Sequence, residues 1–392
     1  MKWSSWIEVN LDSLAHNYKQ LVSLTTAELC PVVKSDAYGH GAPVVVRFLH
    51  RLGAKLFAVS SVEEALTIRE LSQAPLLLLT PPLHEQIPLV IKHRLIPTIE
   101  SAEQVSLFER AADKHFPLPV HLKVDTGLGR LGIKPNDAVA LGERIARSAK
   151  LQLAGVFTHF AEGSSSSRTA RQLRTFLAVK EAFAQAGLNN LIWHAANSAA
   201  FCLGPHTHLD MVRIGTLLYG QGKGADELQL KETWALYAKV ISVRRISAGS
   251  SVGYGGTYKA HRDMLVGVVP IGYSDGFTME PQSTPAVQTA RVVSRIVKGE
   301  KPQAFVDGQP VAVVGKAAMN LTILDLSAVP HPSPGLPVRL IARRASINRD
   351  LPKVYLKDGK PYCTWWNGRL YHPSAQPFDR THSNLYDRVR ML

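Results

Sequence analysis

The sequence contains few cysteines and no long apolar run, and these two features exclude several classes of protein. Its three cysteines, Cys30, Cys202 and Cys363, form neither a disulfide framework nor the spacing of a metal site. No apolar run has the length of a membrane span, and the first ten residues lack the apolar core of a secretory signal peptide. We therefore expect a cytoplasmic protein with no membrane segment and no metal site.

Long runs of lysine or arginine are also absent, although the net charge is +14. The basic residues are scattered, which indicates a generally basic surface or the attraction of an anionic cofactor. Nucleic-acid binding would rest on this charge alone and would be sensitive to salt, so we expect no nucleic-acid partner. A chain of 392 residues, 45% of them hydrophobic, is long enough for two domains.

Residues 11–230 show a regular alternation of strand-like runs and helical stretches. Eight such runs are the number in a (β/α)8 barrel. The structural competitor is a doubly wound open sheet, but no G-x-G-x-x-G motif follows an early strand. The sequence therefore predicts a (β/α)8 barrel. Its predicted strands are Cys30–Lys34, Leu56–Ser60, Pro75–Leu79, Leu95–Ile99, Pro119–Val124, Leu153–His159, Leu191–His194 and Met211–Ile214.

Residues 231–392, together with residues 1–10, are predicted to form a second, mainly β domain. Glycine and proline turns separate its short β-rich runs, and no long helical stretch intervenes. Within residues 346–380, the Asp358-Gly359 and Asn367-Gly368 pairs predict one or two hairpins. The other predicted strands are Ala238–Ile246, Leu265–Pro270, Gln288–Val297, Gln303–Val314, Leu321–Leu326 and Val338–Ala342.

Polar residues follow several of the predicted barrel strands. In a (β/α)8 barrel, active residues lie where strands end and loops begin, so these residues should gather on one rim. Lys34 ends the first predicted strand and is a candidate for forming a Schiff base with a carbonyl, because an apolar wall favours its neutral amine. The alternative is a surface lysine that follows a strand. The remaining rim segments are His121–Arg130, Thr158–Phe160, His194–Ser198 and Arg213–Thr216.

Three segments carry a resemblance to a known family. Residues 32–41, VVKSDAYGHG, are similar to the V-K-x-x-A-Y-G-H-G segment around the pyridoxal phosphate (PLP) lysine of alanine racemases. Residues 6–18 resemble the opening W-x-E-x-x-L-x-x-L-x-x-N-Y of that family, and residues 213–220 read RIGTLLYG. Taken together, the chain resembles the alanine racemase family of fold-type III PLP enzymes from Trp6 to about Leu340.

The resemblance implies that Lys34 holds PLP covalently and acts as one acid/base group. Tyr254 matches the second such group, which the partner subunit supplies in this family, so a homodimer is implied. Racemisation removes a proton from one face of a carbon and returns one to the other face, and a single fixed base reaches one face best. The implied reaction interconverts L-alanine and D-alanine and supplies D-alanine for peptidoglycan.

The resemblance also assigns residues to the cofactor. Arg213 matches the arginine that faces the pyridine nitrogen, and a permanently charged donor there restrains side reactions. His159 matches a histidine beside the cofactor ring; the alternative is a satisfied histidine at a strand end. The positions that match phosphate-binding residues and their motif are Tyr38, Asn197, Ser198, Gly215, Thr216 and, further along, Tyr386.

Four more positions match residues near the substrate. Arg130 matches an arginine that helps to orient the substrate carboxylate and the catalytic tyrosine. Tyr273 and Met319 match a tyrosine at the substrate entry and a methionine whose backbone amide meets that carboxylate. Lys123 matches a position that is often carbamylated, which would turn a cation into an anion able to pair with Arg130. At position 320 the family usually has an aspartate, but this chain has Asn320.

Other functions stay open at this point. A PLP-dependent decarboxylase of the same architecture would use a cysteine in a C-x-x-x-D segment, and neither Cys202 nor Cys363 lies in one. A racemase of broader specificity and a degenerate family member of low activity are the remaining alternatives. Asn320 and the altered C-terminal tail favour the last of these, whereas Lys34, Tyr254 and Arg213 argue against it. The aromatic segment 346–380 has no recognised counterpart.

Overall fold

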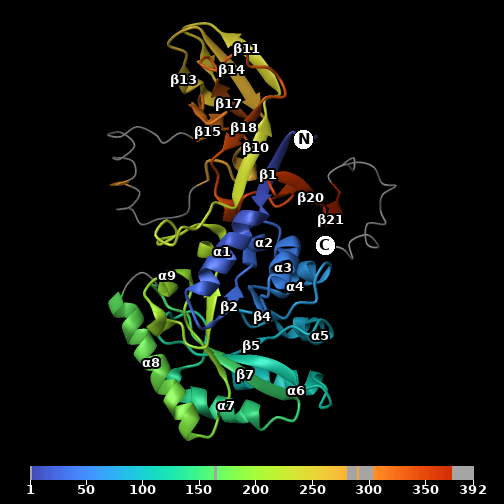
Figure 1. Cartoon of the computed structure of the whole chain (residues 1–392), viewed down its shortest axis with the longest axis vertical. Helices are drawn as coiled ribbons and strands as arrows, with labels where there is room; N and C mark the ends of the chain where they lie inside the picture. The colour runs from blue at the N-terminus through green and yellow to red at the C-terminus, as the bar shows by residue number, and fades with distance from the viewer. Residues whose placement is uncertain (1, 163–165, 280–288, 291–302, 373–392) are drawn as a thin grey trace. The chain divides into compact units, whose positions relative to one another are not determined.

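The computed structural model describes residues 2–162, 166–279, 289–290 and 303–372 (Figure 1). It divides the chain into two compact units: Asp12–Thr233, here called the barrel unit, and Met1–Leu11 with Trp234–Leu392, called the β unit. The sequence had placed these divisions after residues 10 and 230. Within the described residues, no helix is long and apolar enough to span a membrane.

Eight parallel strands close into a ring in the barrel unit, as the sequence predicts. Six of them form one sheet in the order β2-β9-β8-β7-β6-β5, and β3 pairs with β4. Parallel bridges between Val32 and Ala58 and between Leu77 and Ile96 join the two sheets and complete the ring. The strands are β2 (Glu28–Pro31), β3 (Phe57–Val59), β4 (Leu76–Leu78), β5 (Thr98–Ile99), β6 (Leu118–Lys123), β7 (Leu151–Phe157), β8 (Ile192–His194) and β9 (Met211–Ile214).

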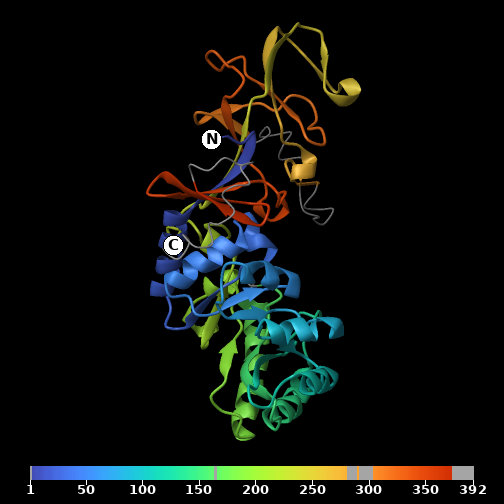
Figure 2. The same cartoon turned by 90° about the vertical axis from the view of Figure 1, so that its right-hand side faces the viewer.

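Helices lie on the outside of these strands (Figures 1 and 2). Serine side chains cap two of them: Ser61 accepts a hydrogen bond from Glu64 N, and Ser101 accepts one from Gln104 N. Because helices cover the ring, strands such as β3 and β4 are buried on both faces and apolar throughout. The helices are α1 (Leu11–Ser23), α3 (Ala42–Arg51), α4 (Val62–Arg69), α5 (Ile87–Lys92), α6 (Ala102–Ala111), α7 (Ala138–Ala146), α8 (Ser166–Gln185) and α9 (Ser198–Phe201).

The first predicted strand is too long at its end. Strand β2 stops at Pro31, and Lys34 begins the short element α2 (Lys34–Gly39), in which the four residues 35–38 all have positive φ angles between 52° and 56°. A left-handed turn of non-glycine residues costs about 1–2 kcal/mol per residue. Side chains offset part of this cost, since Glu64 accepts from Ser35 N at 2.6 Å and Asp36 accepts from Ala42 N at 2.8 Å. The side chains of Glu64 and Asp36 therefore hold this segment in its left-handed turn.

The β unit is built on an eight-stranded sheet with the order β16-β15-β18-β10-β1-β19-β20-β21. The N-terminal strand β1 lies inside this sheet, antiparallel to β10 and parallel to β19. Both views show β1 (blue) beside β10 (yellow). The strands are β1 (Ser5–Asn10), β10 (Trp234–Lys239), β15 (Ala304–Val306), β16 (Gln309–Val311), β18 (Pro337–Leu340), β19 (Lys353–Lys357), β20 (Lys360–Trp366) and β21 (Arg369–Tyr371).

Smaller sheets complete the β unit. A three-stranded sheet has the order β11-β14-β17, and β12 pairs with β13. The predicted run Ala238–Ile246 is in fact two strands, β10 and β11, that belong to different sheets. The predicted run Gln288–Val297 lies mostly outside the described residues. The strands are β11 (Ser242–Ile246), β12 (Ser251–Val252), β13 (Tyr258–Lys259), β14 (Met264–Val269) and β17 (Thr322–Asp325).

The hairpins expected within residues 346–380 are confirmed as far as the described residues extend. Strand β20 pairs antiparallel with both β19 and β21. The turns are Asp358-Gly359 and Asn367-Gly368, and all four residues have positive φ angles, between 46° and 71°. Such turns match the right-handed twist of the flanking strands.

Candidate active site

Polar and charged side chains gather at the carboxyl end of the barrel, at or just after the ends of several different strands. Because the strands are parallel, their carboxyl ends open on the same face, where barrel enzymes carry their active sites. Lys34 follows β2, Lys123 ends β6, His159 follows β7, and Arg213 lies in β9.

Arg213 is fixed in the middle of this group. Its side chain is 2% exposed, and Nη2 donates to the carbonyls of Thr158 at 2.8 Å and Ala195 at 3.0 Å. Its guanidinium also lies 5.2 Å from the centre of the Phe157 ring. Burial lowers the pKa of Arg213 to about 10, so the group stays charged at neutral pH. The barrel therefore holds one immobile positive charge near its carboxyl end.

Two buried histidines extend from this arginine. Arg213 Nη1 donates to His194 Nδ1 at 2.7 Å, which leaves His194 Nε2 to donate to His121 Nδ1 at 2.8 Å. Burial, followed by the charge of Arg213, lowers the pKa of His121 to about 3 and that of His194 well below its ordinary value. Both rings are thus neutral at neutral pH and act as a fixed chain of hydrogen bonds behind the arginine.

His159 lies near the second terminal nitrogen of Arg213. Its Nδ1 lies 3.4 Å from Arg213 Nη2. Burial and then the charge of Arg213 lower the pKa of His159 to about 3, with smaller contributions from Arg130 and two lysines. A neutral ring in this place can stack or accept a hydrogen bond without adding positive charge.

Lys34 is half-buried at the start of the left-handed turn. Burial and then the charge of Arg130 lower its pKa, while Glu64 raises it. A lysine amine that loses its proton more easily is a better nucleophile and a better base. This is the environment that a lysine with covalent or acid/base chemistry requires.

Tyr38, Ser198 and Gly215 lie together close to this turn. A Cβ atom on Gly215 would lie 2.4 Å from the Tyr38 hydroxyl, so only glycine permits this close approach. Ser198 Oγ accepts from Gly215 N at 3.0 Å and Leu217 N at 3.4 Å. Burial raises the pKa of Tyr38 to about 12, so its hydroxyl keeps its proton. The hydroxyls of Tyr38 and Ser198 can each donate to an anion and suit a phosphate dianion, so these residues fit the phosphate of PLP.

The other residues predicted for the phosphate have different positions. Asn197 precedes α9, and its Oδ1 accepts from Ala200 N at 3.0 Å, so its side chain holds the turn that carries Ser198. Thr216 follows Gly215 and begins a short 3₁₀ turn, Thr216–Tyr219. Tyr386 lies outside the described residues.

Lys123 and Arg130 belong to the segment that leaves β6. Lys123 is 4% exposed and donates to the carbonyl of Leu79 at 3.0 Å. Burial and the charges of Arg130 and Arg213 lower the pKa of Lys123 to about 8. Arg130 is exposed, and its charge contributes to the lowered pKa values of both Lys34 and Lys123.

The β unit brings together the three other predicted site residues on neighbouring loops. Tyr273 N donates to Ala318 O at 3.0 Å, next to Met319. A Cβ atom on Gly253, the residue before Tyr254, would lie 3.9 Å from Lys316 N of the same loop. Tyr254, Tyr273 and Met319 are 75%, 46% and 56% exposed.

Asn320 takes part in holding these loops. Its Nδ2 donates to Ser274 Oγ at 2.8 Å, and Ser274 Oγ donates to Met319 O at 2.7 Å. A Cβ atom on Gly272 would lie 2.2 Å from Ala318 O, so the two loops are in close contact. The amide that replaces the usual aspartate is therefore integrated into the fold.

Sequence reasoning missed several residues that hold the site. It listed His121 and His194 in the predicted rim but gave them no role, although a histidine inside the apolar strand segment VHL was a visible signal. Glu64, which clamps the turn at Lys34, lies on α4 and carries no motif. Gln172 on α8 joins two loops of the site, and no motif in the sequence marks it.

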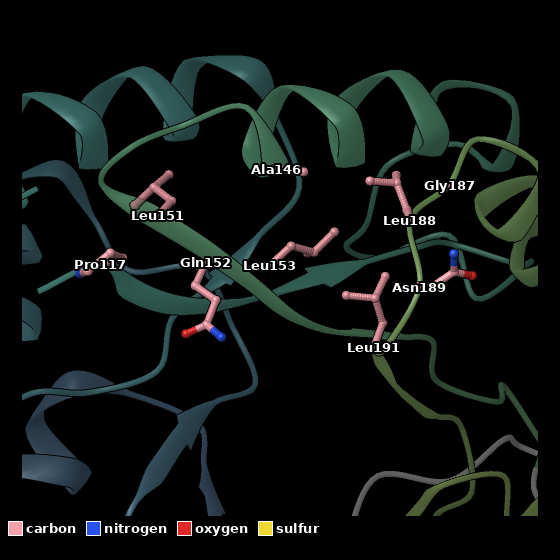
Figure 3. Close-up of a pocket in the computed structure, with 9 residues that line it drawn as sticks. All are labelled: Pro117, Ala146, Leu151, Gln152, Leu153, Gly187, Leu188, Asn189 and Leu191. Carbon is pink, nitrogen blue, oxygen red and sulfur yellow. The ribbon is translucent and has the colours of Figure 1, made fainter.

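A separate pocket lies away from these residues (Figure 3). It has a volume of about 430 Å³ and is lined mainly by residues at the amino ends of β7 and β8 and at the end of α7, including Leu151, Leu188 and Ala146. Active sites of barrel enzymes lie at the opposite, carboxyl ends. We therefore assign the chemistry to the cluster around Lys34 and Arg213.

A closed (β/α)8 barrel with a poised lysine and a buried arginine at its carboxyl end defines an enzyme site of the barrel class. Comparison with known proteins also indicates an enzyme. Family models for the alanine racemase N-terminal and C-terminal domains match residues 9–222 and 233–353. The alanine racemase of Desulfovibrio desulfuricans is 34% identical over 342 residues, which cover 84% of this chain and 87% of that protein.

Solved structures give the same result. The alanine racemase of Clostridium difficile 630 has a TM-score of 0.85 and 26% identity, with 93% of this chain and 99% of that chain covered. The biosynthetic alanine racemase of Pseudomonas aeruginosa has a TM-score of 0.75 and 30% identity, covering 90% and 99%. This chain belongs to the alanine racemase family and is an isomerase of that family.

Proposed function

We propose that this chain interconverts L-alanine and D-alanine with PLP held on Lys34, and that Lys34 and Tyr254 exchange protons on opposite faces of the substrate. The observation that carries the proposal is the half-buried Lys34, whose pKa is lowered by burial and by Arg130. When bound, PLP supplies an electron sink that makes the α-proton of an amino acid acidic. The protein's part is to bind, to orient and to move protons.

The barrel unit holds the cofactor in this proposal. Tyr38, Ser198 and the backbone at Gly215 and Thr216 bind the phosphate. Arg213 would face the ring nitrogen and would not protonate it, since the guanidinium does not give up its proton at neutral pH. The neutral His159 ring lies against the cofactor and adds no charge.

Arg130 and Met319 orient the substrate carboxylate, and Tyr273 lines the entry. Carbamylation of Lys123 would supply an anion that pairs with Arg130. Support comes from the pKa of Lys123, about 8, because carbon dioxide reacts with the neutral amine. The small substrate follows from the family, and the product serves peptidoglycan synthesis in the cytoplasm.

The second acid/base group comes from a partner subunit in a homodimer. Tyr254, Tyr273 and Met319 are all exposed and lie on neighbouring loops of the β unit. Large apolar side chains gathered in this way are typical of a surface that a partner covers. A second copy of the chain would bury them and complete the site.

A chiral assay tests the proposal. The protein is reconstituted with PLP, L-alanine is added, and the enantiomers are separated over time for the wild type and for Tyr254→Phe, with Tyr258→Phe as the matched control. D-alanine that forms with the wild type and the control but is reduced about 10²- to 10⁴-fold with Tyr254→Phe supports two-base racemisation. Release of carbon dioxide without D-alanine would establish a decarboxylase instead, and neither product would indicate another substrate.

A further inference from the structure

Gln172 is a buried polar residue that the mechanism above does not use. It lies in the second turn of α8, the long helix at the edge of the barrel unit in Figure 1, and is 2% exposed. A glutamine on a covering helix usually points to solvent, and burying its amide costs free energy unless both ends find partners. The placement of this side chain therefore calls for an explanation.

Both ends of the Gln172 amide are bonded to loops of the active site. Oε1 accepts from Ala161 N at 2.9 Å, and Nε2 donates to His159 O at 3.4 Å, both on the loop after β7. Nε2 also donates to Thr126 Oγ1 at 3.2 Å, on the loop after β6. One side chain thus joins two consecutive loops at the carboxyl end of the barrel.

The loop after β6 is rigid enough to pass this restraint on to Arg130. Asp125 Oδ1 accepts from Gly127 N at 3.0 Å and Leu128 N at 2.8 Å, and Oδ2 accepts from Gly129 N at 2.9 Å. A backbone bridge between Val124 and Ile133 closes the base of the loop. Thr126 therefore cannot move without moving the segment that ends at Arg130.

The loop after β7 carries His159 and Thr158, and both contact Arg213. Thr158 Oγ1 also lies 2.8 Å from Thr126 Oγ1, which gives the two loops a second direct contact. Gln172 consequently connects the loop after β6, which carries the exposed Arg130, with the loop after β7, which contacts the buried Arg213.

We propose that Gln172 is a positioning residue: its amide fixes the Arg130 loop against the His159 loop and so holds Arg130 at the substrate carboxylate. This inference rests on the proposed role of Arg130 in alanine racemisation. Loss of the amide would let the Arg130 loop move, and a displacement of about 1 Å can cost up to about a hundredfold in rate.

The charges around Lys34 predict a second consequence. Arg130 lowers the pKa of Lys34, Glu64 on α4 raises it, and His159 is neutral. If Arg130 moves away, the pKa of Lys34 rises. Lys34 is a free amine only in the complex with substrate, and kcat reports the pKa values of that complex, so the acidic limb of the profile of kcat against pH then shifts to higher pH.

The test uses Gln172→Met, which keeps the length of the side chain and removes all three hydrogen bonds. Gln185→Met is the control, because Gln185 lies on the same helix, is exposed and donates a hydrogen bond to Glu181 on that helix. We expect Gln172→Met to raise KM for alanine about tenfold or more, with the shifted pH profile and a normal content of PLP per subunit. Gln185→Met should match the wild type.

A second readout does not depend on activity. Hydrogen exchange of the apoprotein should show faster exchange at Gly127, Leu128 and Gly129 in Gln172→Met but not in the control. Thr126→Val, which breaks the same link from the other side, should reproduce both effects and serves if Gln172→Met does not fold.

A wild-type KM, an unchanged pH profile and unchanged exchange in the folded variants would overturn the inference, even if their thermal stability falls. Wild-type protein that does not racemise alanine would overturn the proposed function. The exchange experiment would then decide the coupling of the loops on its own.

Discussion

The two units hold their site residues in opposite ways. In the barrel unit, Arg213 and Lys123 are 2% and 4% exposed, and hydrogen bonds fix both side chains. In the β unit, Tyr254 and Met319 are 75% and 56% exposed, and backbone hydrogen bonds such as that from Tyr273 N to Ala318 O hold the loops. Burial changes the proton affinity of the side chains in the barrel unit. Exposure leaves the side chains in the β unit accessible to a partner.

We infer from this difference how the proposed mechanism divides its tasks between the two units. The barrel unit sets charge and proton affinity, because desolvation acts strongly on Lys34, Lys123 and the histidines around Arg213. In the proposed mechanism, the β unit supplies side chains whose surroundings a second subunit would complete. Substitutions in the barrel unit should therefore alter the cofactor site or stability, and substitutions in the β unit should alter turnover while the cofactor stays bound.

The largest effect should come from Lys34→Ala. We expect at least about a thousandfold loss of racemisation, together with loss of the visible absorbance that PLP shows when it is attached to the protein. Tyr254→Phe should lose turnover but keep this absorbance, since its hydroxyl does not hold the cofactor. Absorbance that persists in Lys34→Ala would remove the lysine assignment, and absorbance lost in Tyr254→Phe would break the division between the units.

Removal of the buried Arg213 should lower the free energy of unfolding. Arg213→Met leaves the carbonyls of Thr158 and Ala195 without this donor, and we expect a loss of about 3 kcal/mol in the free energy of unfolding. The control is Arg262→Met in the β unit, because Arg262 is exposed and its ion pair with Asp325 is worth less than about 1 kcal/mol. Urea unfolding measures both, and equal losses would contradict the comparison.

The neutral histidines predict how stability depends on pH. The pKa values of His121 and His159 are about 3 in the folded protein against an ordinary value of 6.5, so the unfolded chain binds more protons between these limits. Stability should be complete above pH 6.5 and should fall as the pH drops toward 3, by up to about 1.4 kcal/mol per pH unit for each histidine.

Urea midpoints at several pH values measure this slope. His121→Gln should make it shallower, because one proton-binding difference between the folded and unfolded states is removed. His261→Gln, at an exposed position of the β unit, should leave the slope unchanged. A slope that is insensitive to His121 would show that other groups control acid unfolding.

The smallest effect should come from Ser274→Ala. This change removes the hydrogen bonds that link Ser274 to Met319 and Asn320 in an exposed place, so a loss of about 0.5–1 kcal/mol is expected. KM for alanine should rise about twofold to threefold, within the effect of one such bond, while the absorbance of bound PLP stays unchanged. A larger change in the absorbance of bound PLP than in KM would contradict the proposal that this loop contacts the substrate.

Much of the fold followed from periodicity. Alternating strands and helices predicted the eight-stranded barrel, because a chain must bury a regular stripe of apolar residues on each element. The Asp-Gly and Asn-Gly pairs predicted the hairpins, since these residues tolerate the positive φ angles that the turns need. The local motif around Lys34 indicated the chemistry of the barrel unit in the same way.

Other features arose only from contacts between distant parts of the chain. The left-handed turn after Lys34 depends on Glu64, which no local pattern connects to it. The split of residues 238–246 into two strands follows from their pairing with different sheets. These conformations are unfavourable or ambiguous locally, and tertiary contacts decide them.

The barrel and the family could be predicted from the sequence alone, because they depend on apolar periodicity and on short motifs; the residues that carry the chemistry stay a prediction from the same motifs. Tertiary structure alone decided that His121 and His194 support Arg213 and that Gln172 joins the two loops of the site. The physical reason is that proton affinity and side-chain position depend on burial and on partners far away in the chain.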